Sequence, residues 1–374
     1  MKDKKLSIAA IIGFTGACIA FYIGAGFATM QEVMQYEASY GSRFWIVILV
    51  AALIYVYTNI SFATNGNRLG LERGGDIYQH YTGKTIGTFF DYFSAFFCYM
   101  CFIVMQGGAN STAAQQWGLP NGVGAVILTI AVVATTFFGL DGILNALGKL
   151  GPIIIVLILG VSIISLVSGL PNLGQNIADV DNGVYELTQV GGGNPLASGA
   201  SYGGFVILWF AAFLSEIGAK NKLKEVNTGM LISTVFIFGA AAIASLALIG
   251  HIDVTATADI PALVLAERIS PLFAQVFAVI IFAGIYTTAV PLLWTGVGRV
   301  AKEGTQRYKM LTIAGGLVGL VVSLLLPYKA LVNILYGLNG YLGFILVAFM
   351  IIYDVRTRMS SRLPAMSMKS DKTA

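Results

Sequence analysis

The sequence has few charged residues and almost no histidine. Asp, Glu, Lys and Arg make up 11% of its 374 residues, and two residues are histidine. Soluble proteins carry about 25% charged residues, so a chain that is 57% hydrophobic is expected to be solvated mainly by lipid. His80 and His251 have no metal-ligating partner at a suitable spacing, which argues against a metal site built on histidine.

Motifs of several protein classes are also missing. The three cysteines, Cys18, Cys98 and Cys101, all lie in apolar runs, so no disulfide framework is expected. The Cys98–Cys101 spacing is that of a redox motif, but burial in a lipid-embedded helix disfavours the thiolate, and packing is the favoured role. No phosphate-binding loop or Ser-His-Asp arrangement is found, so we expect neither an enzyme nor an organic cofactor. The N-terminal "MKDKK" runs directly into an apolar span without a small-residue cleavage site, so no cleavable signal is expected.

What the sequence has in abundance is apolar runs of membrane-spanning length. A helix that crosses a bilayer needs about 20 apolar residues. Apolar runs bounded by Gly, Pro and Asn predict ten spans, at residues 7–36, 43–66, 86–116, 121–138, 143–169, 195–219, 226–250, 271–300, 309–326 and 329–355.

The basic residues orient these spans. Lys and Arg accumulate in cytoplasmic loops. If the N-terminus lies inside, only Arg43, Arg268 and Lys329, of 22 Lys and Arg residues, fall in outside segments. The sequence therefore predicts a multi-pass protein of the cell membrane with both termini in the cytoplasm. The net charge of +4 is explained by this topology, and lipid rather than nucleic acid is the expected partner; the oligomeric state is not predicted.

The span count divides the chain into two halves. The longest connection, residues 171–194, follows the fifth span and contains no Lys or Arg. Because five is odd, the first half (1–170) and the second (195–355) must have opposite orientations, with residues 356–374 as a cytoplasmic tail. This arrangement is typical of secondary transporters with inverted repeats. The predicted fold is thus an all-α membrane protein of ten helices in a five-plus-five inverted repeat.

Glycines interrupt the first span of each half. "YIGAGF" lies in span one and "SYGGFV" in span six. In inverted-repeat transporters the corresponding helices are broken near mid-membrane, and substrate and ions bind at the breaks. Glycine tolerates the backbone angles that a break needs. The alternative is that these glycines only allow close helix packing.

The break hypothesis selects the candidate substrate-binding residues. Backbone and side chains on both sides of the two breaks are included, with two amides that share a face of span three at a spacing of four residues. The set is Gly24, Ala25, Gly26, Phe27, Gln106, Asn110, Tyr202, Gly203, Gly204, Phe205 and Trp209. The amides could equally bond a neighbouring helix, and each aromatic ring could simply pack.

Two acids within or near the spans are candidates for a gate ion pair or a proton carrier. Acidic residues inside a membrane are functional candidates. Glu32 lies six residues beyond Gly26, and Glu216 precedes Lys220 by four residues near the inner surface. For Glu216 a local ion pair with Lys220 is the favoured role.

Two segments outside the spans also read as helices. "GGDIYQHY" at 74–81 predicts a cytoplasmic amphipathic helix, and "DIPALVLAERI" at 259–269 predicts a half-helix that is too short to span. The second could form an external lid.

Several motifs resemble one family. "IGAGFATMQE" at 23–32, with Tyr36 and Gly41, resembles the first helix of the YkvI family of bacterial membrane proteins. Weaker likenesses follow in the same order at 105–119, 201–205, 285–290 and 338–344. The resemblance implies the amino acid–polyamine–cation superfamily and the LeuT-like fold.

That fold implies a sodium site between the first and eighth spans, where "FAGIYTTAV" places two neighbouring hydroxyls. Carried over by motif, its ligands are the carbonyls of Ala20, Ile23 and Ala283 and the hydroxyls of Thr287 and Thr288. A one-residue change of register would bring in Tyr286, and the threonines could instead bond the carbonyl one turn earlier.

The function predicted from these features is secondary active transport of a small organic solute, an amino acid or related amine, coupled to sodium. The alternatives are a small-molecule sensor with a transporter-like fold and a proton-coupled or uncoupled exchanger.

Overall fold

The computed structural model describes residues 6–23, 25–71, 73–138 and 144–370. These residues form helices joined by turns, and this part of the chain contains no strand. Seven helical stretches in it are long and apolar enough to cross a membrane, or eight if the bent helix α8 (Pro195–Lys220) is included. Two shorter apolar helices, α1 (Ile8–Tyr22) and α6 (Val123–Phe138), occupy two further predicted spans.

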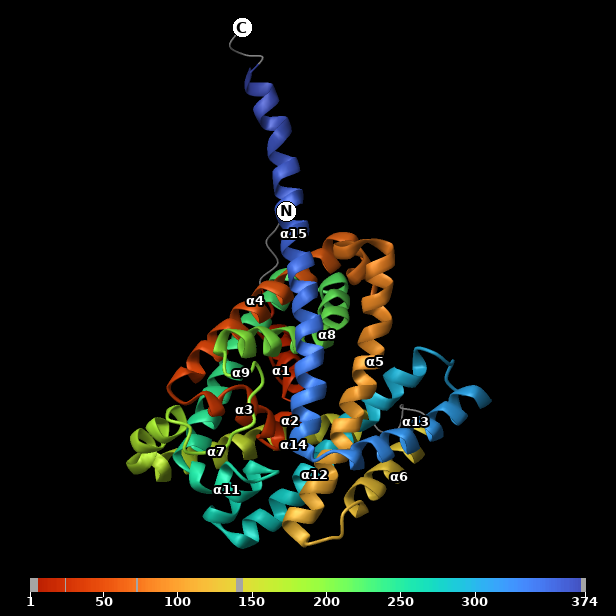
Figure 1. Cartoon of the computed structure of the whole chain (residues 1–374). Coiled ribbons are helices and arrows are strands. Elements are labelled where there is room, and N and C mark those ends of the chain that lie inside the picture. Colours follow the sequence, from red (N-terminus) through yellow and green to blue (C-terminus); the bar gives the residue numbers. More distant parts are fainter. Residues whose placement is uncertain (1–5, 24, 72, 139–143, 371–374) are drawn as a thin grey trace.

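The remaining long helices coincide with predicted spans to within a few residues, apart from extensions at their ends. They are α4 (Phe44–Leu69), α5 (Asp76–Trp117), α7 (Leu144–Asp181), α9 (Leu223–Gly250), α12 (Pro271–Gly298), α13 (Gln306–Leu325) and α15 (Gly337–Ser370). The exception is the tenth span, which begins with α14 (Tyr328–Leu331) and the π-helical turn η2 (Val332–Tyr336). Figure 1 shows the C-terminal part of α15 and the α4–α5 connection at one end of the molecule, and the short helix α11 (Pro261–Ile269) at the opposite end.

The surfaces of these helices carry large apolar side chains, as lipid contact requires. Ile8 on α1, Val235 on α9 and Leu272 on α12 are each more than 70% exposed. A chain with this many exposed aliphatic residues could not stay monomeric in water. Its helices are therefore packed for a bilayer.

The first span is broken into three pieces, as its glycines predict. Helix α1 ends at Tyr22, and Ile23 has non-helical angles (φ −80°, ψ 83°). A short turn, α2 (Ala25–Ala28), follows, and Met30 then adopts the left-handed conformation (φ 59°) before α3 (Gln31–Tyr36) begins. Gly24 lies outside the described residues.

The second break is not where the sequence predicts it. Tyr202 to Phe205 lie within helical residues of α8. The helix instead bends by 51° between its segments Pro195–Leu208 and Phe210–Lys220. The bend is therefore at Trp209, whose side chain lies outside the described set.

Close packing explains the two glycines that were expected at this break. A Cβ on Gly204 would overlap the Gly340 carbonyl oxygen of α15, and one on Gly203 would lie 2.8 Å from the Ile54 side chain of α4. Small residues of this kind let membrane helices approach each other. The packing interpretation is thus correct for this pair.

The two short helices predicted outside the spans are present, and the long external connection is partly helical. Helix α5 begins with a short turn at Asp76 and kinks at Gly83 (φ 77°), and α11 covers residues 261–269. Helix α7 continues to Asp181, so the connection predicted for residues 171–194 is about half helix. Its last part lies against the first span, where the Val190 N–H donates to the Gln35 carbonyl oxygen at 3.1 Å. The predicted tail likewise continues α15 as far as Ser370.

Candidate functional site

A cavity lies beside the break in the first span. The space between atoms here is about 440 Å³, a volume that includes a part open to solvent. Aromatic rings form part of its wall: Phe21 and Tyr22 from the end of α1, Phe205 from α8, and Tyr336 from the π-helical turn η2 (Val332–Tyr336). The remaining wall comes from Gly26 and Glu32 beyond the break, Cys101 and Met105 of α5, Val206 of α8, and Thr288 and Leu292 of α12.

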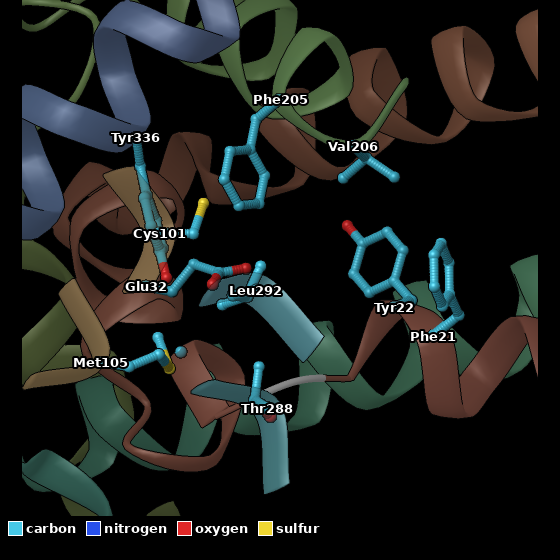
Figure 2. Close-up of a pocket in the computed structure, with 11 residues that line it drawn as sticks. Phe21, Tyr22, Glu32, Cys101, Met105, Phe205, Val206, Thr288, Leu292 and Tyr336 are labelled. Atoms are coloured by element: carbon cyan, nitrogen blue, oxygen red, sulfur yellow. The ribbon is translucent and has the colours of Figure 1, made fainter. Parts of the chain in front are cut away.

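Glu32 is the acid of this cavity. Its carboxylate lies among the ring of Phe205, the Tyr336 side chain and Leu292 (Figure 2). The residue is 5% exposed, and its Oε1 accepts a hydrogen bond from the Tyr202 hydroxyl at 2.7 Å. None of the ion pairs in the described part of the chain includes it. Burying an unpaired carboxylate costs several kcal/mol, of order 3–5 when a partner charge is lost, so this placement points to a functional role.

The backbone opening at Gly26 makes room for this carboxylate. A Cβ on Gly26 would lie 2.5 Å from Oε2 of Glu32 and 3.2 Å from the Tyr336 hydroxyl oxygen. The Gly26 carbonyl accepts from the Thr29 hydroxyl at 2.8 Å, and that hydroxyl also lies 3.1 Å from the Tyr328 hydroxyl. Glycine at position 26 is therefore needed for the contact between the broken helix and Glu32.

The candidate residues near the two glycine-rich segments do not all line the cavity. Phe205 lines the cavity, and Tyr202 contacts two of its lining residues, Glu32 by a hydrogen bond and Tyr22 by an edge-to-face ring contact. Gly203 and Gly204 contact neighbouring helices instead. Phe27 is 1% exposed and packs in the apolar core. Ala25 belongs to α2, and its side chain is outside the described set.

The two amides of span three do not line this cavity. The Gln106 side-chain N–H donates to the Thr129 hydroxyl at 2.7 Å and to the Gly316 carbonyl at 3.1 Å. It thus joins α5, α6 and α13, as the alternative interpretation of this residue proposed. Asn110 donates to Asn121 at 2.7 Å and borders a separate polar hollow that also contains Asp259.

One of the two threonines proposed as sodium ligands borders the cavity at the broken helix. Thr288 lines the same cavity as Phe21, Tyr22 and Gly26. The hydroxyls of Thr287 and Thr288 both donate to the Gly284 carbonyl, at 2.8 and 3.0 Å. These are the bonds to the preceding turn that the alternative interpretation of the two threonines predicted. The two bonds bring the Gly284 carbonyl oxygen and the two hydroxyl oxygens together. Each hydroxyl acts as a donor here, so its oxygen keeps lone pairs that can bind a cation.

The carbonyl that accompanies these hydroxyls belongs to Gly284 and not to Ala283. Ala283 borders a different, wholly apolar hollow together with Phe282 and Tyr286. Tyr286 itself bonds Thr135 at 2.7 Å. Ala20 belongs to α1, and Ile23 is its C-terminal cap. In the described part of the chain no group of three or more His, Cys, Asp or Glu side chains could hold a metal ion.

Glu216 does not line the cavity at the broken first span. Its side chain is 46% exposed and pairs with Lys220 four residues along α8. The local pair is therefore confirmed, and Glu32 is the acid that belongs to the cavity.

A cluster of charges joins helices at the end that the sequence predicts to be cytoplasmic. Asp91 of α5 accepts hydrogen bonds from Arg73, in the α4–α5 connection, and from Arg299, which follows α12. The Asp91 side chain is only 10% exposed. The Arg299 guanidinium also lies 4.3 Å from the centre of the Tyr92 ring. The three elements are held together on this side of the cavity.

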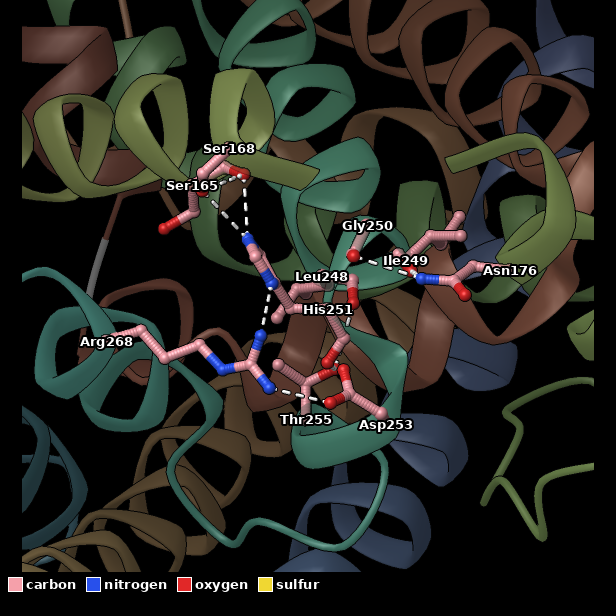
Figure 3. A network of polar contacts seen from close by, with 10 residues as sticks. All are labelled: Ser165, Ser168, Asn176, Leu248, Ile249, Gly250, His251, Asp253, Thr255 and Arg268. Atoms are coloured by element: carbon pink, nitrogen blue, oxygen red, sulfur yellow. Dashed lines mark hydrogen bonds and ion pairs between the residues drawn. The ribbon is translucent and has the colours of Figure 1, made fainter. Parts of the chain in front are cut away.

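A second network holds α11 at the opposite end (Figure 3). Arg268 of α11 lies 2.8 Å from His251 Nδ1 and donates to Asp253 at 2.6 Å. His251 Nε2 lies 2.9 Å from the Ser165 carbonyl of α7. Since Arg268 can only donate, Nδ1 is the acceptor and the proton of the neutral ring sits on Nε2. Helix α11 also bonds the broken span, because the Ala262 N–H donates to the Thr29 carbonyl at 3.1 Å.

Sequence analysis missed several of these residues. Tyr336, Cys101 and Met105 look like packing residues in apolar runs, and only their common cavity sets them apart. Glu37 was also missed: it is fully buried, and one carboxylate oxygen has its bond to Ser245 at 2.9 Å while the other has no partner among the described residues. An acid five residues after Glu32 in the same apolar region was the available signal.

Comparison with known proteins identifies the fold. No family model matches the chain, and no curated protein matches its sequence. Among solved structures, MhsT in complex with L-phenylalanine is 15% identical, with a TM-score of 0.59 over 91% of this chain and 88% of that one. Mhp1 in an inward-facing conformation is 17% identical, with a TM-score of 0.56 over 92% and 76%.

A mutant of the manganese transporter of Eremococcus coleocola has a TM-score of 0.54 at 15% identity, and the match covers 94% of this chain and 80% of that one. The chain thus has the LeuT-like fold of membrane transporters, as the resemblance implied. These three proteins are transporters and not enzymes. Membership of the YkvI family remains a prediction.

Proposed function

We propose that the chain is a secondary active transporter of a small organic solute, an amino acid or a related amine, in the cell membrane. The observation that carries this proposal is the cavity at the broken first span, with the Glu32 carboxylate inside it. Discontinuous helices create binding sites near the bilayer midplane because their free backbone groups must face protein, water or ligand.

The closures at the two ends support alternating access. The Asp91 cluster joins elements on one side of the cavity, and the α11 network joins elements on the other. Alternating access requires contacts on each side that can form and break in turn. Two polar networks at opposite ends of the molecule fit that requirement, and we place both termini on the cytoplasmic side with Asp91.

Sodium is the coupling ion that we propose. The site would comprise the Gly284 carbonyl, the hydroxyls of Thr287 and Thr288, and carbonyls at the end of α1, those of Ala20 and Ile23. A hard cation prefers oxygen ligands of this kind, and Thr288 lies at the cavity that the broken helix borders. If the coupling ion is instead a proton, Glu32 is the acid placed to carry it, because Glu216 is exposed and paired with Lys220.

Uptake into proteoliposomes tests the proposal. The purified full-length chain is reconstituted, and a panel of radiolabelled amino acids and amines is offered with and without inward sodium or proton gradients. Accumulation above the equilibrium level in a gradient supports secondary active transport. Binding without any flux would instead favour the sensor, and neither binding nor flux for the whole panel would contradict the proposal.

A further inference from the structure

The charge balance of the central cavity limits what it can bind. Of the described residues that line it, Glu32 alone is acidic, and none is Lys, Arg or His. The nearest polar partner of the carboxylate is the neutral Tyr202 hydroxyl. A buried carboxylate without a cation is unfavourable. A ligand with one positive charge would therefore neutralise the negative charge of Glu32 in the cavity.

The free side of the carboxylate faces the cavity. Oε1 is engaged by Tyr202, whereas Oε2 lies over Gly26 with no ion pair in the described part of the chain. An ammonium group has three hydrogen-bond donors and no acceptor. Such a group can bond Oε2 directly, and a side chain at position 26 would displace that oxygen.

The walls around this carboxylate suit the body of an organic cation. The rings of Tyr22, Phe205 and Tyr336 come from three different elements and border the same space. Aromatic faces attract ammonium groups, most strongly where water is excluded. Met105 and Leu292 add apolar surface without hydrogen-bond donors.

An amino acid would carry its own carboxylate into this space. A zwitterion has no net charge, so compensation of the Glu32 charge would be left to the proposed coupling ion alone. Its carboxylate would also meet no Lys, Arg or His among the described lining residues. Like charges brought together in a desolvated site disfavour binding.

Building on the proposed function, we infer that the substrate is a small organic amine without a carboxylate, whose ammonium group pairs with Glu32. Glu32 already supplies one carboxylate to the cavity, so the ligand needs only an ammonium group. The geometry thus divides the proposed substrates into two groups and selects the cationic one.

Matched ligand pairs test this inference on the purified full-length protein. Thermal stabilisation and competition binding compare phenethylamine with phenylalanine and isobutylamine with valine; the methyl esters of both amino acids keep the ammonium group and mask the carboxylate. We expect each amine and each ester to bind about tenfold or more tightly than its amino acid, a difference of about 1.4 kcal/mol or more. Tighter binding of the amino acids would overturn the inference and leave the proposed function standing.

Two variants separate charge from shape. Glu32→Gln keeps an acceptor for the Tyr202 hydroxyl but removes the charge, so the preference for amines should disappear. Glu267→Gln changes an exposed acid of α11 and should leave the preference unchanged. A preference that survives in Glu32→Gln would overturn the assignment of Glu32. If no amine, ester or amino acid binds or is transported, the proposed function fails as well.

Discussion

The Tyr202 hydroxyl donates to Oε1 of Glu32 across 2.7 Å and thereby joins α8 to α3 over a sequence separation of 170 residues. Both residues are at least 95% buried. This bond links the two predicted halves of the chain at the wall of the central cavity. A change that disturbs it should affect the position of the carboxylate as well as stability.

Tyr202→Phe removes the donor and leaves the ring that stacks on Tyr36, with centroids 4.6 Å apart. A hydrogen bond to a charged group contributes about 1.5–3 kcal/mol, so we expect a lower midpoint of thermal unfolding and weaker binding of cationic ligands. Fluorescence-monitored melting measures the first effect and competition binding the second. Tyr341→Phe, on an exposed part of α15, is the control and should match the wild type. Equal behaviour of both variants would show that the bond is energetically unimportant.

Gly26→Ala tests the close approach at the broken helix. The added Cβ would lie 2.5 Å from Oε2 of Glu32, so the carboxylate must move away from the cavity or the helix must shift. We expect weaker ligand binding, by about tenfold or more if 1.4 kcal/mol or more is lost, in a protein that still folds. Gly16→Ala on α1 is the matched control, because its Cβ would meet no atom within 4 Å. Unchanged affinity in Gly26→Ala would place the binding site elsewhere.

The proposed sodium site is tested by replacing both threonines with Val, which preserves shape and removes the hydroxyls that flank the Gly284 carbonyl. We expect sodium-stimulated uptake and any stabilisation by sodium to be lost. Thr135→Val, whose hydroxyl bonds Tyr286 at 2.7 Å, is the control away from that carbonyl. A sodium response that persists in the double variant rules this site out.

The sequence predicted features that depend on local composition. Apolar runs located the helices, and Gly-Ala-Gly at 24–26 located the first break, because an interruption of a spanning helix needs such residues. The second break was misplaced because Gly203 and Gly204 serve contacts with Ile54 and Gly340. Those contacts depend on which helices are neighbours, and a glycine pair looks the same in a break and at a packing interface.

The candidate site was predicted in part for the same reason. Glu32 and Phe205 were found because an acid and aromatic residues next to glycine-rich segments stand out locally. Tyr336 joins them from the other end of the chain, and the partners of Gln106 lie on α6 and α13. These pairings are set by tertiary packing, which one sequence does not reveal.

Asp91→Asn should open the end predicted to be cytoplasmic. Asp91 receives both Arg73 and Arg299, and removing its charge leaves two guanidinium groups facing each other in a partly buried site. Cys101 lines the central cavity and is buried, so it reports the opening when Cys18 and Cys98 are replaced by Ala. We expect faster thiol labelling of Cys101 from the Asp91 side in Asp91→Asn. Asp76→Asn, which removes only a 3.9 Å contact with Arg73, should label like the parent; equal rates in all three proteins would contradict a closing role for Asp91.

Arg268→Gln should loosen α11 at the other end. The guanidinium connects this helix to His251 and Asp253, and His251 in turn reaches the Ser165 carbonyl of α7 (Figure 3). Without it, α11 keeps its bond to the Thr29 carbonyl but loses its polar attachment to α7 and α10 (Ile252–Thr255). We therefore expect faster hydrogen exchange across residues 261–269, measured by mass spectrometry, and no change in α13.

The tautomer of the His251 ring gives an independent test of its contact with Arg268. The chain contains two histidines, so His80→Gln leaves His251 as the source of the ring-nitrogen signals in a protein labelled with ¹⁵N-histidine. Because Arg268 can only donate to Nδ1, the wild-type contact requires the tautomer with its proton on Nε2. That tautomer should dominate in both proteins, because the Ser165 carbonyl also keeps the proton on Nε2, whereas the Nδ1 signal should shift in Arg268→Gln, where its hydrogen-bond donor is lost. The other tautomer in the parent protein would show that Arg268 does not bond the ring, and the polar contacts of α11 would then be those with Asp253 and the Thr29 carbonyl.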